Sequence, residues 1–425
     1  MSDPETTLAV LANGVRVVAM RLPHVETAAA SVFVRTGSAH ESARLAGISH
    51  FVEHMAFKGT RERTCQQVNL DAERLGAEVN AHTDKDHTAY HMRGLAAHAG
   101  RFVRMLGDIV LNGTYPEAEL ERERQVIRHE SIEDEDDPLS IAFRLFDKAC
   151  YGAHPLARPV IGSPRNVERI TRADLLGYVG RQYSGTNVVV GVAGNIDADQ
   201  VVAEAEAAFA PMPRGSANTV REPAYIGGLR SRRVPGSVQT HVVLGFPIPS
   251  LASDDAASLL AAALFGEGMS SPLLDEIRER RGLAYHAACS ADVTSLAGQF
   301  VVEATTAPEH VDELLAEVAR LLQARADGID AGELERARNQ IAVRAAGAHE
   351  RPFRLIEDAA LDLFVHGRVR AQSELAARVD AVSASDVRDA FRRMLGERAS
   401  IAIAGKVKNG IDERLLERFE RRAPG

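Results

Sequence analysis

Two histidines and a glutamate lie within five residues of the chain, in the stretch AGISHFVEHMAFKGT. On a helix, His50, Glu53 and His54 occupy positions i, i+3 and i+4 and therefore share one face. The positions around them are apolar, so we expect the helix to be buried. Burying two imidazoles and a carboxylate is costly unless they are hydrogen-bonded or bound to a cation. The stretch therefore predicts either a hydrogen-bonded core cluster or a metal site.

If the cluster binds a metal, two imidazoles and a carboxylate suit zinc. HxxEH is the inverted order of the HExxH motif, in which the histidines hold zinc and the glutamate is the general base. This pattern makes His50 and His54 two of the ligands and Glu53 the base that acts on a zinc-activated water. A catalytic site needs a third protein ligand and an open position for that water.

The third ligand is expected on a helix that begins near Pro116 and carries many carboxylates. Most of these acids should form a solvated face. Glu123 and Glu130 share a stripe with Ile127 at positions i, i+4 and i+7. Spacing alone leaves the choice between these two carboxylates open.

An internal repeat organises the elements that must position these residues. ELERERQVIRHESIEDEDDP, which starts at Glu119, is echoed 214 residues later by ELERARNQIAVRAAGAHERP. The Ala193-Gly194 pair of NVVVGVAGNID is echoed 211 residues later by Ala404-Gly405 of ASIAIAGKVKN. Two matches in the same order at nearly the same offset predict two homologous halves.

Within each half, segments of strand composition and segments of helical periodicity occur in mixed order, without a regular βαβ alternation. RVVAM, AAASVFVR and VQTHVVLGF are typical of strands, and DELLAEVARLLQARADG is typical of a helix. The fold class is therefore α+β, with a mainly antiparallel sheet packed with helices in each half. We expect a linker within residues 211–237, a zinc-binding domain at 1–215 and a homologous domain without zinc ligands at 216–425.

Composition narrows the class of protein. The 425 residues are 45% hydrophobic and 26% charged, with no apolar run long enough to span a membrane. The net charge of −9 argues against general nucleic-acid binding. Three widely separated cysteines predict neither a disulfide framework nor a thiolate metal site, and they fit a reducing bacterial cytoplasm.

With these motifs in place, the chain resembles the inverzincin peptidases, the family of pitrilysin, insulin-degrading enzyme and mitochondrial processing peptidase. GISHFVEHMAFKGT looks like the family's zinc helix, preceded by TGSAHE, and ERQVIRHE looks like its third-ligand motif. Glu130 lies 76 residues after His54, as that motif requires. The resemblance implies one zinc ion per chain, with Glu130 as third ligand and Glu123 orienting a ligand histidine.

The resemblance extends over essentially the whole chain. FGEGMSSPLLDEIRERRGLAY resembles the family's glycine-containing loop and Arg/Tyr motif, which implies that Arg278 and Tyr285 bind the substrate carbonyl and stabilise the oxyanion. Without the resemblance, Arg278 would be read as a solvated charge. Two departures are Pro272, where arginine is frequent, and His82, where tyrosine or phenylalanine is commoner. Neither touches the expected chemistry.

The peptide in these relatives lies in a closed chamber and adds an edge strand to the sheet. The resemblance places Asn80 and Ala81 near that strand, although an ordinary polar edge strand would explain them as well. The half-length members act as dimers, in which the Arg/Tyr pair faces the partner's zinc. We therefore expect a homodimer, or a heterodimer with a related subunit.

These observations predict a zinc-dependent endopeptidase that hydrolyses short or unfolded peptides inside a closed dimeric chamber. The alternative is a non-catalytic or partner subunit of a heterodimeric processing protease. The second half lacks HxxEH, and Arg344 stands at the repeat position of Glu130, so only the first half should bind zinc. An intact Glu53 favours the enzyme, because a purely structural copy has no need of it.

Overall fold

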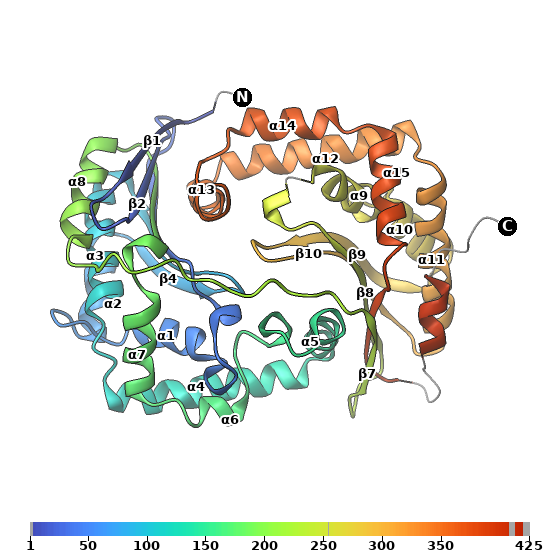
Figure 1. Ribbon diagram of the computed structural model, residues 1–425, viewed down its shortest axis with the longest axis horizontal. Coiled ribbons are helices and arrows are strands. Elements are labelled where there is room, and N and C mark those ends of the chain that lie inside the picture. The colour runs from blue at the N-terminus through green and yellow to red at the C-terminus, as the bar shows by residue number, and fades with distance from the viewer. Residues whose placement is uncertain (1–2, 254, 408–412, 420–425) are drawn as a thin grey trace. The chain divides into compact units, whose positions relative to one another are not determined.

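The computed structural model describes residues 3–253, 255–407 and 413–419, and its chain divides into two compact units (Figure 1). Each unit is built from three separate stretches of the chain. The first unit comprises Met1–Ser131, Pro159–Arg221 and Ala346–Ser373. The second unit comprises Ile132–Arg158, Glu222–Ala345 and Glu374–Gly425.

The first unit contains a six-stranded sheet in the order β1-β2-β6-β3-β5-β4. The β2 and β6 strands are parallel, and every other neighbouring pair is antiparallel. This arrangement leaves β4 at one edge of the sheet. The strands are β1 (Glu5–Val10), β2 (Arg16–Arg21), β3 (Thr27–Val34), β4 (Glu78–Thr83), β5 (Thr88–Leu95) and β6 (Val188–Gly194).

The second unit contains a five-stranded sheet in the order β7-β11-β8-β10-β9. Its β7 and β11 strands are parallel and its other pairs antiparallel. The topology therefore repeats that of β2-β6-β3-β5-β4, as the internal sequence repeat predicts. The strands are β7 (Gly228–Arg233), β8 (Thr240–Ile248), β9 (Ala284–Val293), β10 (Gly298–Thr306) and β11 (Ser400–Gly405).

Helices make up most of the remaining regular structure, and together with the two sheets they confirm the α+β class. In the first half they are α1 (Ile48–Ala56), α2 (Cys65–Arg74), α3 (Ala99–Asn112), α4 (Glu117–Asp136), α5 (Pro138–Tyr151), α6 (Pro164–Val167), α7 (Arg172–Gln182) and α8 (Ala198–Phe209). In the second half they are α9 (Ala256–Gly266), α10 (Pro272–Leu274), α11 (Val311–Asp327), α12 (Ala331–His349), α13 (Pro352–His366), α14 (Gln372–Ala381) and α15 (Ala384–Met394).

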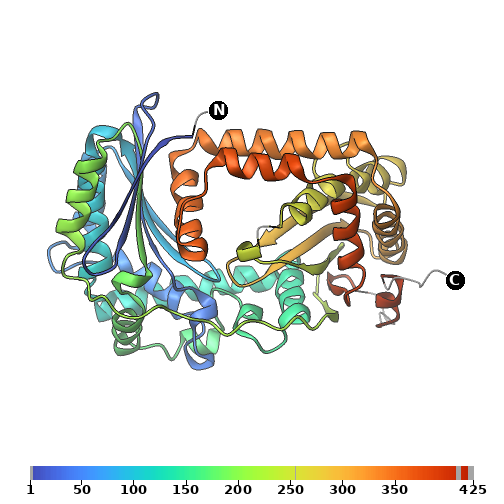
Figure 2. The same ribbon diagram turned by 45° about the horizontal axis from the view of Figure 1, so that its top comes forward.

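The compact units differ from the predicted division of the chain at residues 215 and 216, because each half contributes a helix to the other unit. The α5 helix packs on β7, β8 and β11 of the second unit, and α13 packs on β2, β3 and β6 of the first. Figure 2 shows the strands of the first sheet between α8 on one side and α13 on the other. The expected linker at 211–237 has no helix or strand up to residue 227, but β7 lies within it.

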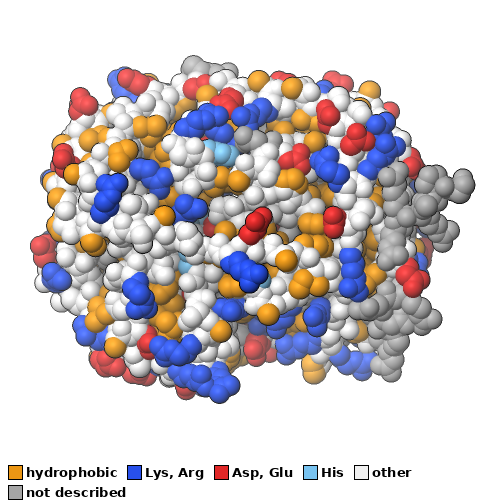
Figure 3. Space-filling view, viewed as in Figure 1, with side chains coloured by type: hydrophobic (Ala, Val, Ile, Leu, Met, Phe, Trp, Pro, Cys, Tyr) orange, Lys and Arg blue, Asp and Glu red, His pale blue; other side chains and the backbone are white. Residues whose placement is uncertain are grey.

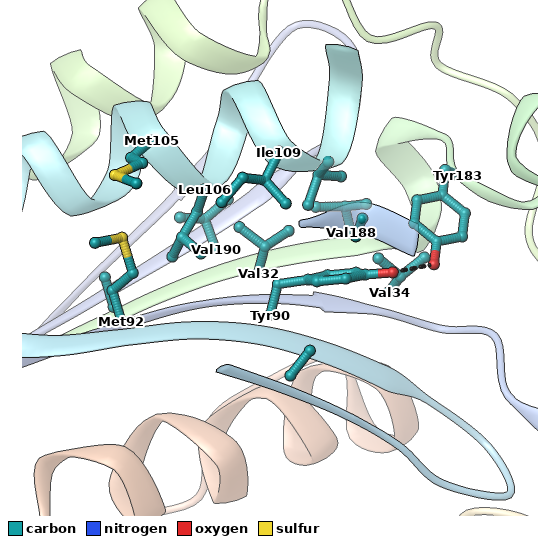
Figure 4. Packing of buried hydrophobic residues seen from close by; sticks show 14 of the residues in the cluster. Val32, Val34, Tyr90, Met92, Met105, Leu106, Ile109, Tyr183, Val188 and Val190 are labelled. Atoms are coloured by element: carbon teal, nitrogen blue, oxygen red, sulfur yellow. Dashed lines mark hydrogen bonds between the residues drawn. The ribbon is translucent and has the colours of Figure 1, made fainter. Parts of the chain in front are cut away.

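The core of the first unit lies between its sheet and helices α1, α3, α7 and α8 (Figure 4). Valines of β3 and β6 face Leu106 and Ile109 of α3 there. The hydroxyls of Tyr90 and Tyr183 are buried and form a hydrogen bond of 2.8 Å with each other. On the other face, α13 closes a smaller cluster with Phe33 and Val189. Both faces of the first sheet are therefore covered, which fixes the strands that position the site.

Neither the distribution of surface charge nor the cysteines point to a further functional site. On the face shown in Figure 3, acidic and basic side chains are both scattered among uncharged ones. Cys65, Cys150 and Cys289 are free thiols. Within the part of the chain that the structure describes, no helix is long and apolar enough to cross a membrane.

Candidate active site

The start of α1 is held by a carboxylate that lies before it. Glu41 accepts hydrogen bonds of 2.7 Å from the backbone N–H groups of both Gly47 and Ser49. These groups have no partner within the helix, so a carboxylate there is stabilising. Gly47 has φ +102°, and a Cβ at this position would lie 2.7 Å from the carbonyl oxygen of Ile161. Only glycine therefore fits at Gly47, in the turn that sets the direction of α1.

The two faces of α1 differ in their burial. Ile48, Phe51, Val52 and Met55 are fully buried in the core of the first unit. By contrast, the side chains of His50 and His54 keep 18% and 15% of their surface exposed. The expectation of a buried helix is thus correct for its apolar face and wrong for its polar face. That face is partly desolvated but keeps some exposed surface.

The α4 helix brings a carboxylate to both histidines. Glu130 Oε2 lies 3.4 Å from His54 Nε2 and 3.9 Å from His50 Nε2. One ligand atom from each of the three residues lies within 4.8 Å of the other two. The donor atoms around a tetrahedral zinc ion stand about 3.3 Å apart. Two imidazoles and a carboxylate at this spacing therefore fit a zinc ion after small side-chain movements.

Glu123 lies behind this group rather than in it. Its Oε2 accepts a hydrogen bond of 3.0 Å from His54 Nδ1, which leaves Nε2 of the same ring to face Glu130. Its Oε1 lies 2.7 Å from the ammonium of Lys58. A carboxylate on the far nitrogen fixes the tautomer and orientation of a ligand histidine. The structure thus distinguishes Glu130, which faces Nε2 of both histidines, from Glu123, which bonds to the far nitrogen of His54.

Lys58 and Arg124 were not singled out in the sequence. Lys58 lies four residues after His54, near the end of the stretch GISHFVEHMAFKGT, and this position was the only signal for it. Arg124 is buried, donates to the carbonyl oxygens of Val167 and Ile170, and lies over the Phe51 ring with Cζ 5.5 Å from its centre. The contact between Arg124 and Phe51 therefore links α4 to α1, the two helices that carry the candidate ligands.

Burial shifts the titration of the polar face. It lowers the pKa of His50 to about 4, with a further lowering from His54, so the ring is neutral and able to act as a ligand. Burial raises the pKa of Glu53, and interactions with Thr83 and His54 offset part of that rise. A carboxyl with a raised pKa holds a proton more readily, which suits a general base that later returns it.

The edge strand β4 lies next to α1. Asn80 is exposed, whereas the side chain of Ala81 is buried in the core. The N–H of Ala81 donates to the side-chain oxygen of Asn80 at 2.8 Å. Within the described residues β4 pairs only with β5, so its other edge has no strand partner. Ala81 could contact a ligand only through its backbone.

Arg278 and Tyr285 lie in the second unit and contact each other. Arg278 belongs to a π-helical turn, Asp275–Arg280, and Tyr285 to the edge strand β9. The guanidinium carbon lies 5.3 Å from the centre of the tyrosine ring, a cation–π contact. Tyr285 is 81% exposed, which is far above the usual burial of tyrosine. The pair therefore presents two side chains that can donate hydrogen bonds at this surface.

Comparisons with known proteins agree with this architecture. The family described as "Insulinase (Peptidase family M16)" matches residues 16–164, and "Peptidase M16 inactive domain" matches residues 169–341. A protein from Rickettsia bellii named "Uncharacterized zinc protease" is 30% identical over 93% of this chain and 96% of its own. Another protein of that name, from Mycobacterium tuberculosis, is 33% identical over 95% of each chain.

Among solved structures, a protease from Helicobacter pylori superposes with a TM-score of 0.88 over 95% of this chain and 100% of its own, at 21% identity. At that identity the likeness establishes the fold alone. The sequence relatives, by contrast, match in both identity and length. The chain therefore belongs to the M16 peptidase family and is of its half-length bacterial type.

Proposed function

We propose that the protein is a zinc-dependent endopeptidase that cleaves short or unfolded peptides. One observation carries the proposal: His50 and His54 of α1 and Glu130 of α4 bring three ligand atoms within 4.8 Å of one another, and Glu53 shares the α1 face of the two histidines. A zinc ion bound there would act as a Lewis acid toward water and the scissile carbonyl. Membership of a family whose relatives are named zinc proteases supports the same activity.

The chain's own residues would carry the remaining steps. Glu53 would take the proton of the attacking water and later give it to the leaving amine. Glu123 would keep Nε2 of His54 free for the metal. Arg278 and Tyr285 would donate hydrogen bonds to the oxyanion as it forms, which is where such donors lower the barrier most.

A peptide would bind by adding a strand to β4. The open edge of this strand offers backbone groups at Asn80 and Ala81, and the chain reaches Thr83 beside Glu53. In strand addition, β4 would form hydrogen bonds with the backbone of the peptide rather than with its side chains, so the substrate must be extended. Since the N–H of Ala81 is bonded to the Asn80 side chain, the peptide would have to displace that side chain.

The dimeric chamber and the cytoplasmic location belong to the same proposal. One chain carries both the zinc ligands and the Arg/Tyr pair, so a homodimer would have complete sites. The competing function is a non-catalytic or partner subunit, which the description "inactive domain" for residues 169–341 keeps in view. Those residues do not include Glu53 or any of the proposed zinc ligands.

The decisive experiment is Glu53→Gln, assayed on a peptide library together with its zinc content and its mass in solution. We expect zinc to be retained and cleavage to fall by about 10²–10⁴-fold or more, because the amide cannot accept the proton. Full activity in this variant would disprove the mechanism. A wild-type protein that binds zinc but cleaves nothing without a second subunit would favour the partner function.

A further inference from the structure

A second group of histidine and carboxylate side chains lies in the first unit and shares no residue with the proposed zinc ligands. His82 is on β4, His87 is on the turn between β4 and β5, and Glu357 is on α13. One ligand atom from each residue lies within 4.8 Å of the other two, the same limit met by the first group. Neither His87 nor Glu357 has a place in the proposed peptidase mechanism.

The hydrogen bonds of this group leave ligand atoms unused. His87 is 4% exposed, and its Nδ1 donates to Asp86 Oδ1 at 2.8 Å. Its Nε2 is buried and has no hydrogen-bond partner among the described residues. A buried ring nitrogen without a partner is costly. A carboxylate on the other nitrogen is the arrangement that orients metal-binding histidines and makes them stronger ligands.

The other two members also have donor atoms to spare. Arg354 binds Glu357 through Oε2, while Oε1 of the same carboxylate lies 3.5 Å from His82 Nε2, too far for a strong hydrogen bond. A third of the His82 side chain is exposed, which leaves a route for an ion to enter.

We propose that His82, His87 and Glu357 form a second zinc site in each chain. Two imidazoles and one carboxylate are a donor set that zinc prefers, and three protein ligands leave a position for water. The ion would join α13, which comes from the second half of the sequence, to the β4–β5 hairpin of the first half. It would thereby brace the edge strand that we propose receives the peptide, but its existence does not depend on that function.

The test is to count bound zinc in the full-length protein after dialysis against buffered zinc. We expect about two equivalents in wild type and about one in His82→Phe and in Glu357→Gln. The His50→Ala variant, which removes a ligand of the first site, should also retain about one. The double variant His50→Ala/His82→Phe should retain none.

Two results would overturn the second site. One is a single equivalent in wild type with none left in His50→Ala. The other is an equal loss in His286→Phe, a control on β9 of the second unit whose ring lies 3.1 Å from Glu303 and outside the group. Because metal content is read apart from cleavage, an inactive protein with two equivalents would reject the proposed function and keep this site.

Discussion

The α1 helix of the first unit and the α9 helix of the second occupy equivalent places on sheets of the same topology. Each lies against the edge strand of its own sheet, β4 for α1 and β9 for α9. The α9 sequence, AASLLAAALFG, is apolar, and most of the helix is buried. The α1 sequence keeps a half-buried polar face. The same backbone arrangement thus carries the proposed zinc ligands in the first unit and core residues in the second.

The helices that face them differ in the same way. Glu130 of α4 approaches both histidines, whereas Arg344 of α12, at the repeat position, is exposed and pairs with Glu267 at 3.0 Å. A buried apolar helix has no donor for a metal, so a carboxylate opposite it would be unpaired. All of the proposed zinc ligands are therefore present in the first copy and absent from the second, as expected if each is costly without the others.

The largest expected difference between the two units is tested by making the same substitution at the two repeat positions, Glu130 and Arg344. Glu130→Gln should lower zinc affinity and cleavage by at least about 100-fold, because a neutral amide is a poor zinc ligand. Arg344→Gln should change neither, since that side chain lies on the surface of α12. Zinc titration with a competing chelator and a peptide assay would measure both. Equal effects would mean that the second copy also binds the metal.

In the second unit, Arg278 is the residue for which we propose a direct role in catalysis. Arg278→Ala should lower kcat by about 10²–10³-fold with zinc content unchanged, because an oxyanion donor acts in the transition state. Arg280→Ala is the matched control, because this arginine lies on the same turn and pairs with Asp275 at 2.9 Å. Steady-state kinetics on both variants would decide. An unchanged kcat in Arg278→Ala would remove the pair from the site.

For the free energy of unfolding, by contrast, we expect a substitution in α9 to cost more than one on the polar face of α1. Leu260→Ala, at a fully buried position of α9, should cost about 2–5 kcal/mol of unfolding free energy, because it leaves a cavity. In zinc-free protein, His50→Ala should cost much less, because the buried Nδ1 of His50 has no partner among the described residues. Urea denaturation of both variants in chelator would test this. A larger loss for His50→Ala would make α1 a core helix like α9.

The smallest expected effect concerns the support behind the ligands. Glu123→Gln should weaken zinc binding by about 10–100-fold, because His54 loses the carboxylate that holds its tautomer. Glu119→Gln, a carboxylate on the same helix that pairs with Arg122, should leave it unchanged. Chelator competition would measure both. Equal affinities for Glu123→Gln and wild type would show that the 3.0 Å contact does not tune the metal.

Much of this architecture could be predicted from local sequence. The period of HFVEH put three polar side chains on one helix face, and α1 has that face. The repeated Ala-Gly endings predicted β6 and β11, which hold the same place in the two sheets. These inferences hold because helix period, strand composition and turn residues act over a few neighbours. The family resemblance added Glu130, which spacing alone did not distinguish from Glu123.

Other features depended on contacts between distant parts of the chain. The exchange of α5 and α13 between the units, the Lys58–Glu123–His54 chain and the approach of Glu357 to His82 join residues far apart in sequence. No local pattern encodes such pairs, because they depend on how whole elements pack. The sequence by itself therefore determined the fold class and the face of the ligand helix. Only the tertiary structure decided that Glu123 bonds to His54, since that contact rests on distances set by packed helices and sheets.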